Sequence, residues 1–355
     1  MVSVEFHPLR VAAVDPLTDD AVAITFDVPN HLTDRFRYLP GQHVTIRADV
    51  DGEDVRRSYS VCSNANRGIL RVGVKRLEGG AFSTWATSRL MPGATLDVMP
   101  PIGEFTITPD PDVTNHYAAI AAGSGITPVL SLITTTLEAE PFSRWTLVFG
   151  NRGANSIMFL DEVEGLKDRY PDRLHLIHVL SREQPDLDLF GGRIDEAKLA
   201  ELFARLVDFD NVNHWYLCGP YEMVTAARKL IEGRGVDPDR VHDELFFAGP
   251  VDPATLVPPE EIEGAVALRV TVGGRATDTR MDPDMSILDA ALRVRSELPF
   301  SCKGGMCASC KAHLTDGDVR MDKNYALIDS EIEAGYILTC QSHPTGDTVS
   351  VDYDV

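Results

Sequence analysis

The chain has 355 residues, of which 44 % are hydrophobic and 25 % are charged, and its formal net charge is −21. This composition is ordinary for folded domains and argues against a disordered chain. The absence of a basic stripe argues against a nucleic-acid-binding protein, and the length indicates two or three domains.

No targeting segment or membrane span is expected. Residues 1–10 contain no apolar stretch. The stretch His116–Leu137 carries no acidic residue, Lys or Arg and is long enough for a membrane span, but Gly123, Gly125 and Pro128 interrupt it. We therefore expect a buried strand, a tight turn and a helix there, and a cytoplasmic location by default.

Residues 1–110 are predicted to form an antiparallel β-barrel. Short segments of alternating apolar and polar residues are separated by turn pairs such as Pro40-Gly41 and Asp51-Gly52. One helix fits Ala81–Leu90. The predicted strands are Leu9–Val14, Val22–Phe26, His43–Arg47, Arg57–Val61, Ile69–Lys75 and Thr95–Met99.

Residues 111–248 show a different sequence pattern, in which apolar strand-like segments alternate with longer helical segments. This alternation predicts a parallel, doubly wound α/β sheet. The predicted strands are Tyr117–Ala121, Trp145–Phe149, Leu174–Leu180 and His214–Leu217. The predicted helices are Ile126–Ala139, Met158–Arg169, Glu196–Leu206 and Tyr221–Glu232.

A linker is predicted over residues 249–265, because four prolines and four acidic residues fall within Gly249–Gly264. Residues 266–355 then form a third domain. Its predicted elements are two strands (Leu268–Val272 and Ala276–Met281), a helix (Ser286–Val294) and a final strand (Thr348–Tyr353).

Four of the six cysteines lie in the last 54 residues. They read C-x4-C-x2-C, with the last cysteine after 29 intervening residues, which is the spacing of plant-type [2Fe–2S] ligands: Cys302, Cys307, Cys310 and Cys340. A zinc site would call for a second C-x2–4-C pair, and a redox C-x-x-C for a βαβ context. We predict a [2Fe–2S] site, with Cys62 and Cys218 outside it.

Arg57-Ser58-Tyr59-Ser60 lies on a predicted barrel strand. Alternation places Arg57 and Tyr59 on one face, where a cation can pair with a pyrophosphate and a ring can pack on a flat cofactor. Gly79–Ser83 opens a helix, and a glycine-rich helix start is a natural anion site. Each segment alone also fits a purely structural role.

Gly123-Ser124-Gly125-Ile126-Thr127-Pro128 follows an apolar strand and opens a helix. Glycines there allow a tight turn and the close approach of a pyrophosphate to the helix N-terminus. Cys218-Gly219-Pro220 ends the last predicted strand of the same domain, so both motifs fall on the carboxyl edge of the sheet. A buried structural cysteine is the alternative for Cys218.

Together these motifs resemble the ferredoxin–NADP reductase superfamily over nearly the whole chain, in the order R-x-Y-S, G-x-x-S, G-x-G-x-x-P, C-G-P and plant-type ferredoxin. Residues 298–355, with P-F-S-C-K-G-G-M-C-A-S-C-K-A and M-D-K-N-Y-A-L, are most similar to the reductase components of phenylacetyl-CoA epoxidases. The reductases of 3-ketosteroid 9α-hydroxylases are near relations. The resemblance implies a FAD-binding barrel, an NAD(P)-binding α/β domain and an α+β, β-grasp ferredoxin.

The resemblance also implies roles for individual residues. The FAD site would include Arg57, Ser58, Tyr59, Ser60, Lys75, Gly80 and Ser83. The nicotinamide dinucleotide would bind at Gly123, Gly125, Thr127, Pro128, Cys218 and Gly219. The reacting rings would meet beside Tyr59, Ser60, Cys218, Glu244 and Phe246. Ser181, Arg182 and Arg193 resemble a 2′-phosphate site, which favours NADPH over NADH.

The resulting hypothesis is a reductase that passes electrons from NADPH through FAD and the cluster to an oxygenase or epoxidase component, as in phenylacetate degradation. Neither Glu183 nor His178 is needed as an acid or base in this scheme. A reductase of another ring-hydroxylating oxygenase would share these motifs. A non-catalytic redox sensor is the alternative of a different class, and it would not need the nicotinamide motifs.

Overall fold

A computed structural model describes residues 6–185, 187–247, 264–295, 298–300, 305, 308–324, 326–327 and 329–354. Two compact units emerge. The first contains most of residues 6–247, and the second contains the described residues after 263. The predicted linker lies almost wholly outside the described residues, as do Cys302 and Cys307. Among the described residues, no helix is long and apolar enough to cross a membrane.

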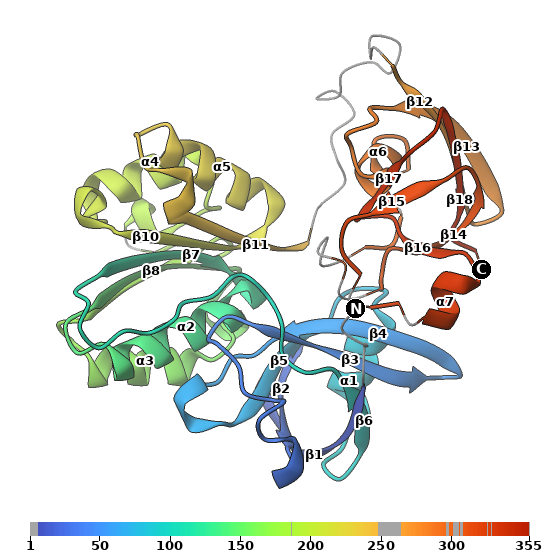
Figure 1. Cartoon of the computed structure of the whole chain (residues 1–355). Coiled ribbons are helices and arrows are strands. Elements are labelled where there is room, and N and C mark those ends of the chain that lie inside the picture. Colours follow the sequence, from blue (N-terminus) through green and yellow to red (C-terminus); the bar gives the residue numbers. More distant parts are fainter. Residues whose placement is uncertain are drawn as a thin grey trace. The chain divides into compact units, whose positions relative to one another are not determined.

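The first unit begins with a six-stranded sheet in the order β4-β3-β6-β1-β2-β5 (Figure 1). Antiparallel pairing joins β1 to β2 and β6, β2 to β5, and β3 to β6, in keeping with the predicted barrel. Helix α1 (Ala81–Ser88) follows β5 and is shorter than expected. The strands are β1 (His7–Thr18), β2 (Ala21–Asp27), β3 (His43–Val50), β4 (Glu53–Ser60), β5 (Leu70–Lys75) and β6 (Thr95–Val98).

The same unit continues with a five-stranded parallel sheet in the order β11-β10-β7-β8-β9. Its strands are β7 (His116–Ala122), β8 (Arg144–Asn151), β9 (Leu174–Leu180), β10 (His214–Pro220) and β11 (Val241–Phe247). The uncharged stretch after His116 forms β7, a 3-10 turn and most of α2, as expected. Strand β11 was not predicted. It lies at the edge of the sheet, and its polar residues His242, Asp243 and Glu244 interrupt the apolar run by which the other strands were recognised.

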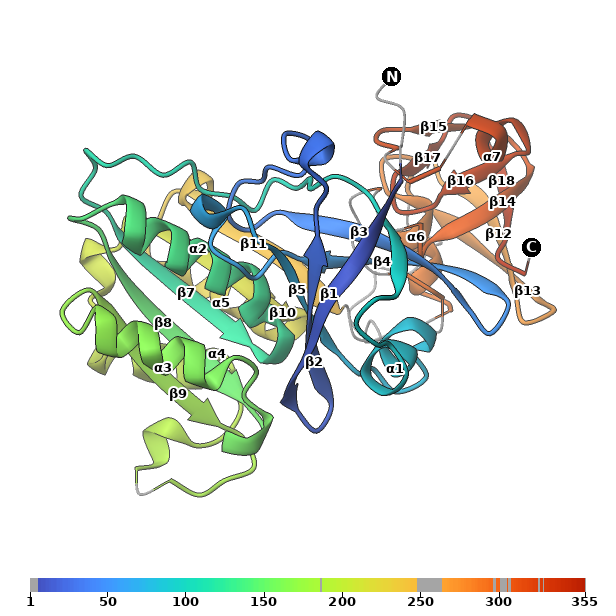
Figure 2. The same ribbon diagram turned by 90° about the horizontal axis from the view of Figure 1, so that it is seen from below.

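Two layers of helices cover this parallel sheet (Figures 1 and 2). Helices α2 (Ile126–Ala139) and α3 (Leu160–Arg169) bury one face, and helices α4 (Glu196–Arg205) and α5 (Tyr221–Glu232) bury the other. Alternation along β7 assigns the faces, since Ala119 packs on the α2 side and Ile120 on the α5 side. The predicted doubly wound fold is confirmed.

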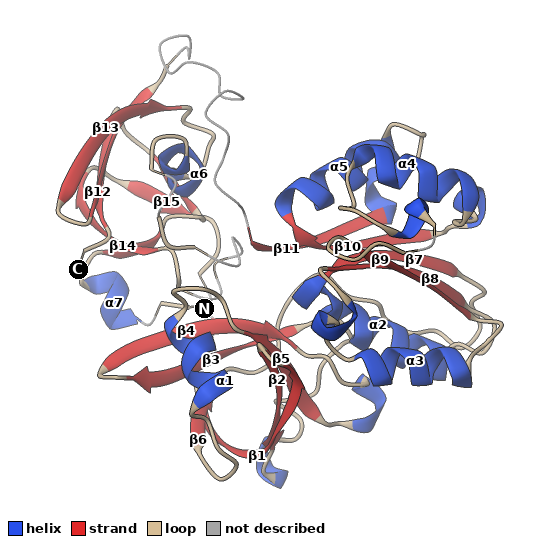
Figure 3. Cartoon of the chain, turned by 180° about the vertical axis from the view of Figure 1, so that it is seen from behind, coloured by secondary structure: helices blue, strands red, loops and turns tan. Residues whose placement is uncertain are grey.

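The second unit is a mixed sheet in the order β13-β12-β18-β14-β16, with helix α6 (Ile287–Leu292) packed on it (Figure 3). Strands β12 and β18 are parallel, and the neighbouring pairs β12–β13, β14–β16 and β14–β18 are antiparallel. This is the expected α+β arrangement. The remaining elements are β12 (Val266–Val272), β13 (Arg275–Met281), β14 (Lys311–Asp316), β15 (Val319–Met321), α7 (Asp329–Glu333), β16 (Tyr336–Leu338), β17 (Ser342–Pro344) and β18 (Thr348–Asp352).

Candidate active site

The barrel and the parallel sheet pack tightly through a glycine on β5. A Cβ added to Gly73 would lie 2.7 Å from Cγ2 of Thr127 and 3.0 Å from the ring of Phe159. Beside this contact, Nη1 of Arg71 donates to Oε1 of Glu162 at 2.6 Å. The two halves of the predicted site are therefore held in one unit, with no room for a side chain at Gly73.

Strand β4 ends with the motif predicted to hold the flavin. The half-buried ring of Tyr59 lies 5.4 Å from that of Phe82, and Ser60 is buried. Arg57 and Ser58 are half-buried, and Nη1 of Arg57 donates to the carbonyl of Arg56 at 2.7 Å. The strand thus offers a guanidinium, an aromatic ring and a buried hydroxyl within four residues, a set that fits a flavin and its pyrophosphate.

The start of α1 gives the other predicted FAD residues partners within the chain. Oγ of Ser83 accepts from the amide of Leu77 at 3.0 Å and donates to the carbonyl of Gly80 at 3.3 Å. Nζ of Lys75 lies 3.6 Å from Oδ1 of Asp20. These contacts order the turn before α1, and the proposed cofactor contacts of Lys75, Gly80 and Ser83 stay predictions.

Three polar side chains from three strands meet at the end of β4. Oγ of Ser60 donates to Oε2 of Glu244 at 3.2 Å, and Nδ1 of His43 lies 3.6 Å from Oε1 of the same carboxyl group. The sequence predicted Ser60 and Glu244 but missed His43, whose only signal is its place after the Pro40-Gly41 turn. Nε2 of His43 is buried and makes no hydrogen bond within the described part of the chain. Such an orphaned buried atom fits a site that a cofactor completes.

The glycine-rich turn after β7 packs directly on the end of β10. A Cβ added to Gly125 would lie 2.1 Å from the carbonyl oxygen of Cys218, and Gly123 has a φ of +54°. Oγ1 of Thr127 donates to the carbonyl of Ser124 at 2.9 Å, and Pro128 is buried in the first turn of α2. The strand order reverses between β7 and β10, so both motifs lie at the topological switch point where such sheets bind dinucleotides.

Cys218 is fully buried at this point. Burial raises the pKa of its thiol well above the ordinary value, and the nearby carboxyl groups of Glu244 and Asp243 raise it further. The thiol therefore stays protonated at neutral pH. It cannot act as a nucleophile in this state, and any role of Cys218 in shaping a nicotinamide site stays a prediction.

The residues predicted to bind a 2′-phosphate come together at the far end of the same edge. The amide of Ser181 donates to the carbonyl of Asn151 at 2.9 Å, and the amide of Gly192 donates to the carbonyl of Leu180 at 3.1 Å. The second bond brings the loop of Arg193 beside the end of β9. Arg182 and Arg193 are both exposed, as a charge that meets a phosphate in water would be.

Asn151 is a further buried polar residue that the sequence did not single out. It lies at the carboxyl end of β8, and neither atom of its side-chain amide makes a hydrogen bond within the described residues. An amide that is buried without partners costs free energy unless a ligand or water satisfies it. Its position suits a nucleotide, although no local pattern in the sequence reveals the burial.

Two of the four predicted iron ligands, Cys310 and Cys340, are buried, while Cys302 and Cys307 lie outside the described residues. The neighbouring loop has the tight backbone that a cluster needs. Gly305 and Ala308 have positive φ values of 78° and 52°. Oγ of Ser309 is buried and makes no hydrogen bond within the described residues, so it fits a donor to a cluster sulfur.

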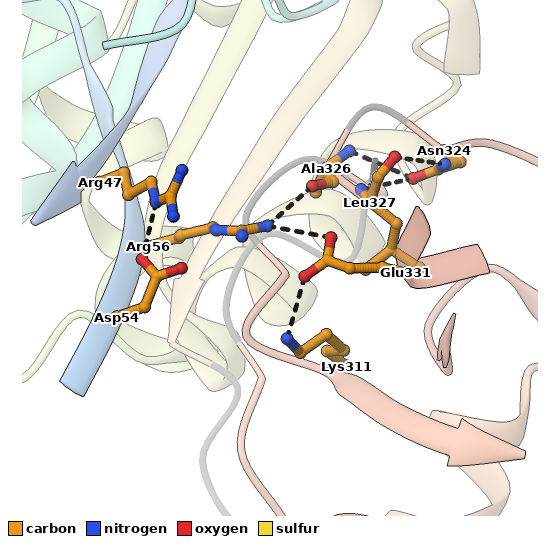
Figure 4. Close-up of polar contacts among 8 residues, drawn as sticks. All are labelled: Arg47, Asp54, Arg56, Lys311, Asn324, Ala326, Leu327 and Glu331. Carbon is orange, nitrogen blue, oxygen red and sulfur yellow. Dashed lines mark hydrogen bonds and ion pairs between the residues drawn. The ribbon is translucent and has the colours of Figure 1, made fainter. Parts of the chain in front are cut away.

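The M-D-K-N-Y-A-L segment supports this loop. A Cβ added to Gly305 would lie 2.8 Å from the carbonyl oxygen of Lys323. Oδ1 of Asn324 accepts from the amide of Leu327 at 2.8 Å, and Nδ2 donates to the carbonyl of Leu327 at 3.0 Å (Figure 4). Lys311 and Glu331 form an ion pair of 3.1 Å nearby (Figure 4). The turn at Asn324 thus fixes the backbone against which Gly305 packs.

This combination of sites defines a class of protein, the electron-transfer reductases. The chain matches three families in order: "Oxidoreductase FAD-binding domain" over residues 8–107, "Oxidoreductase NAD-binding domain" over residues 119–229 and "2Fe-2S iron-sulfur cluster binding domain" over residues 270–345. Its cofactors are FAD, a pyridine nucleotide and a [2Fe–2S] cluster. When bound, these groups would supply hydride and one-electron chemistry, and the residues of the three domains would position them for it.

Relatives that match over nearly their whole length narrow the family to which the chain belongs. It is 44 % identical over 352 residues to a component of the 1,2-phenylacetyl-CoA epoxidase of Escherichia coli, covering 98 % of each chain. It is 34 % identical over 355 residues to the ferredoxin reductase component of 3-ketosteroid-9-alpha-monooxygenase of Mycolicibacterium smegmatis, covering 98 % of this chain and 96 % of that one. The solved structure of phthalate dioxygenase reductase shares the fold, with a TM-score of 0.54 and 22 % identity over 98 % of both chains. The chain belongs to the ferredoxin–NADP reductase-type reductases that carry a plant-type ferredoxin domain.

Proposed function

We propose that this reductase supplies electrons to an epoxidase component that acts on phenylacetyl-CoA in the cytoplasm. The observation that carries the proposal is the 44 % identity that extends over 98 % of both chains. The steroid-monooxygenase reductase, at 34 %, has the same architecture and the same cofactor motifs. Partner choice is therefore the property that separates the two functions.

The proposed donor is NADPH. Arg182 and Arg193 support it, because two exposed guanidinium groups beside the end of β9 suit a 2′-phosphate, which NADH lacks. Arg57 would bind the FAD pyrophosphate, Tyr59 would stack on the flavin, and Ser60 would lie near its reacting nitrogen. Gly123, Gly125 and Thr127 would hold the dinucleotide.

The proposed domain limits are residues 1–110 for FAD, 111–248 for the nucleotide and 266–355 for the cluster, joined by a linker at 249–265. Each family match lies inside one of these ranges. Glu244 and Phe246 would then end the nucleotide domain beside the flavin.

Reconstitution with purified oxygenase components tests the proposal. We expect NADPH oxidation coupled to epoxidation when a phenylacetyl-CoA epoxidase component and its substrate are added, and little coupling with a 3-ketosteroid monooxygenase component. Ferricyanide reduction serves as the control, because it reports the reductase without any partner. Efficient coupling to the steroid component alone would overturn the proposed partner and favour the second function.

A further inference from the structure

Thr339, the residue before the predicted ligand Cys340, is fully buried and hydrogen bonded on two sides. Oγ1 of Thr339 donates to the carbonyl of Cys310 at 2.9 Å, and it lies 2.7 Å from the phenol oxygen of Tyr353. A threonine hydroxyl has one hydrogen, and a carbonyl oxygen can only accept. The hydrogen bonds therefore run in one direction, from Tyr353 to Thr339 to the carbonyl of Cys310.

Tyr353 is itself held by the hairpin between β12 and β13. Its amide donates to the carbonyl of Thr271 at 2.9 Å. The carboxylate of the next residue, Asp354, accepts from the amides of Gly273 at 2.6 Å and Gly274 at 2.7 Å. These two amides lower the pKa of Asp354, so it remains a charged acceptor at neutral pH. The phenol of Tyr353 thus reaches the cysteine segments from a firmly attached backbone.

We propose that Tyr353 is a positioning residue of the iron–sulfur cluster, acting through Thr339 on the backbone of Cys310. The chain of hydrogen bonds joins the segments of two predicted ligands with 29 residues between them, in addition to the backbone bond from Thr339 to Cys310 at 3.2 Å. Its O–H dipoles point toward the carbonyl oxygen of Cys310 and offset part of the negative charge there. Less negative charge beside a predicted ligand favours the reduced, more negative form of the cluster. Consecutive hydrogen bonds also strengthen one another in a buried setting.

The variant Tyr353→Phe removes the terminal donor and keeps the ring. We expect the reduced-to-oxidised ratio of the cluster at a fixed potential to fall about threefold, a negative shift of about 30 mV, since tenfold corresponds to 59 mV for one electron. Potentiometric titration measures this shift, and electron paramagnetic resonance of the reduced cluster should show altered g values. Visible absorbance should bleach about threefold faster in a chelator.

Tyr336→Phe is the matched control. Tyr336 is a half-buried tyrosine of the same unit, on β16, whose ring packs on His313 and Lys311. Its loss of a hydroxyl should leave the potential, the g values and the bleaching rate unchanged. Identical values in Tyr353→Phe and the wild type would overturn the inference.

Substitutions of Thr339 test the route. Thr339→Ser keeps the hydroxyl and should preserve the potential. Thr339→Val should lower the potential at least as far as Tyr353→Phe, because it removes the donor that contacts Cys310 directly. In the double variant Tyr353→Phe, Thr339→Val the two shifts should not add, because both break the same chain. Additive shifts would contradict the route through Thr339, and these readouts need no oxygenase partner, so their failure is distinct from a failure of the proposed function.

Discussion

The two ends of the proposed nucleotide-binding edge differ in burial. At the proposed reacting end, where the two rings would meet, Gly125 packs on the backbone of Cys218, and Ser60 is buried against Glu244. At the far end, Arg182 and Arg193 are exposed on loops. Hydride transfer depends on a fixed distance between two rings, which strand ends in a packed core can maintain. Discrimination of a 2′-phosphate requires only charge within reach, so exposed loops suffice.

The largest effect on the rate of flavin reduction is expected from Gly125→Ala. Its Cβ would lie 2.1 Å from the carbonyl oxygen of Cys218, so the turn must move away from β10. A displacement of about 1 Å at a reacting geometry costs on the order of 100-fold in rate. Stopped-flow measurement of flavin reduction by NADPH checks the result. Gly165→Ala, at an exposed position of helix α3 with nothing near the added Cβ, is the control. A normal rate in Gly125→Ala would show that this contact is not needed.

A smaller effect at the same end is expected from Ser60→Ala. The change leaves the carboxylate of Glu244 without its 3.2 Å donor, and a hydrogen bond to a charged group contributes roughly 1.5 kcal/mol, or about tenfold in rate. Flavin reduction should slow by that factor while the KM for NADPH stays constant. Ser88→Ala removes an exposed hydroxyl of α1 and should change neither value. If only KM rises, Ser60 serves binding and not the reacting geometry.

The features that the sequence predicted best are those that depend on residues close together in the chain. The turn at Gly123–Gly125 and the cysteine spacing depend on neighbouring residues, so both were visible in the chain. The contact of His43 with Glu244 joins positions 201 apart in number, and no local signal anticipates it. Strand β11 was missed because its edge position tolerates charged residues. The short strands β15, β16 and β17 were missed because three residues carry too little periodicity to detect.

Substitutions at the exposed end should have a smaller effect than those at the buried end, and they should affect NADPH but not NADH. Removing the guanidinium in Arg182→Ala or Arg193→Ala should raise the KM for NADPH about fivefold, because exposed charge pairs contribute up to about 1 kcal/mol. The KM for NADH should not change, since it has no 2′-phosphate. Arg169→Ala, at the exposed end of α3, is the matched control. Equal effects on both nucleotides would show that these arginines bind something other than the 2′-phosphate.

The smallest effect concerns the pH dependence of stability at the buried end. Burial raises the pKa of Cys218 above its value in the unfolded chain, so the unfolded state loses this proton first. The stabilisation is complete below about pH 8.5 and declines as the pH rises above that value.

Between pH 7 and pH 9 the free energy of unfolding should fall by about 0.8 kcal/mol more in the wild type than in Cys218→Ala. Cys62→Ala should behave in the same way, because burial raises the pKa of Cys62 to about 12. Urea titrations at the two pH values measure the difference. Parallel pH profiles for the wild type and Cys218→Ala would mean that this thiol ionises without unfolding, and the reacting end would then be more open to water than the packing of Gly125 on Cys218 implies.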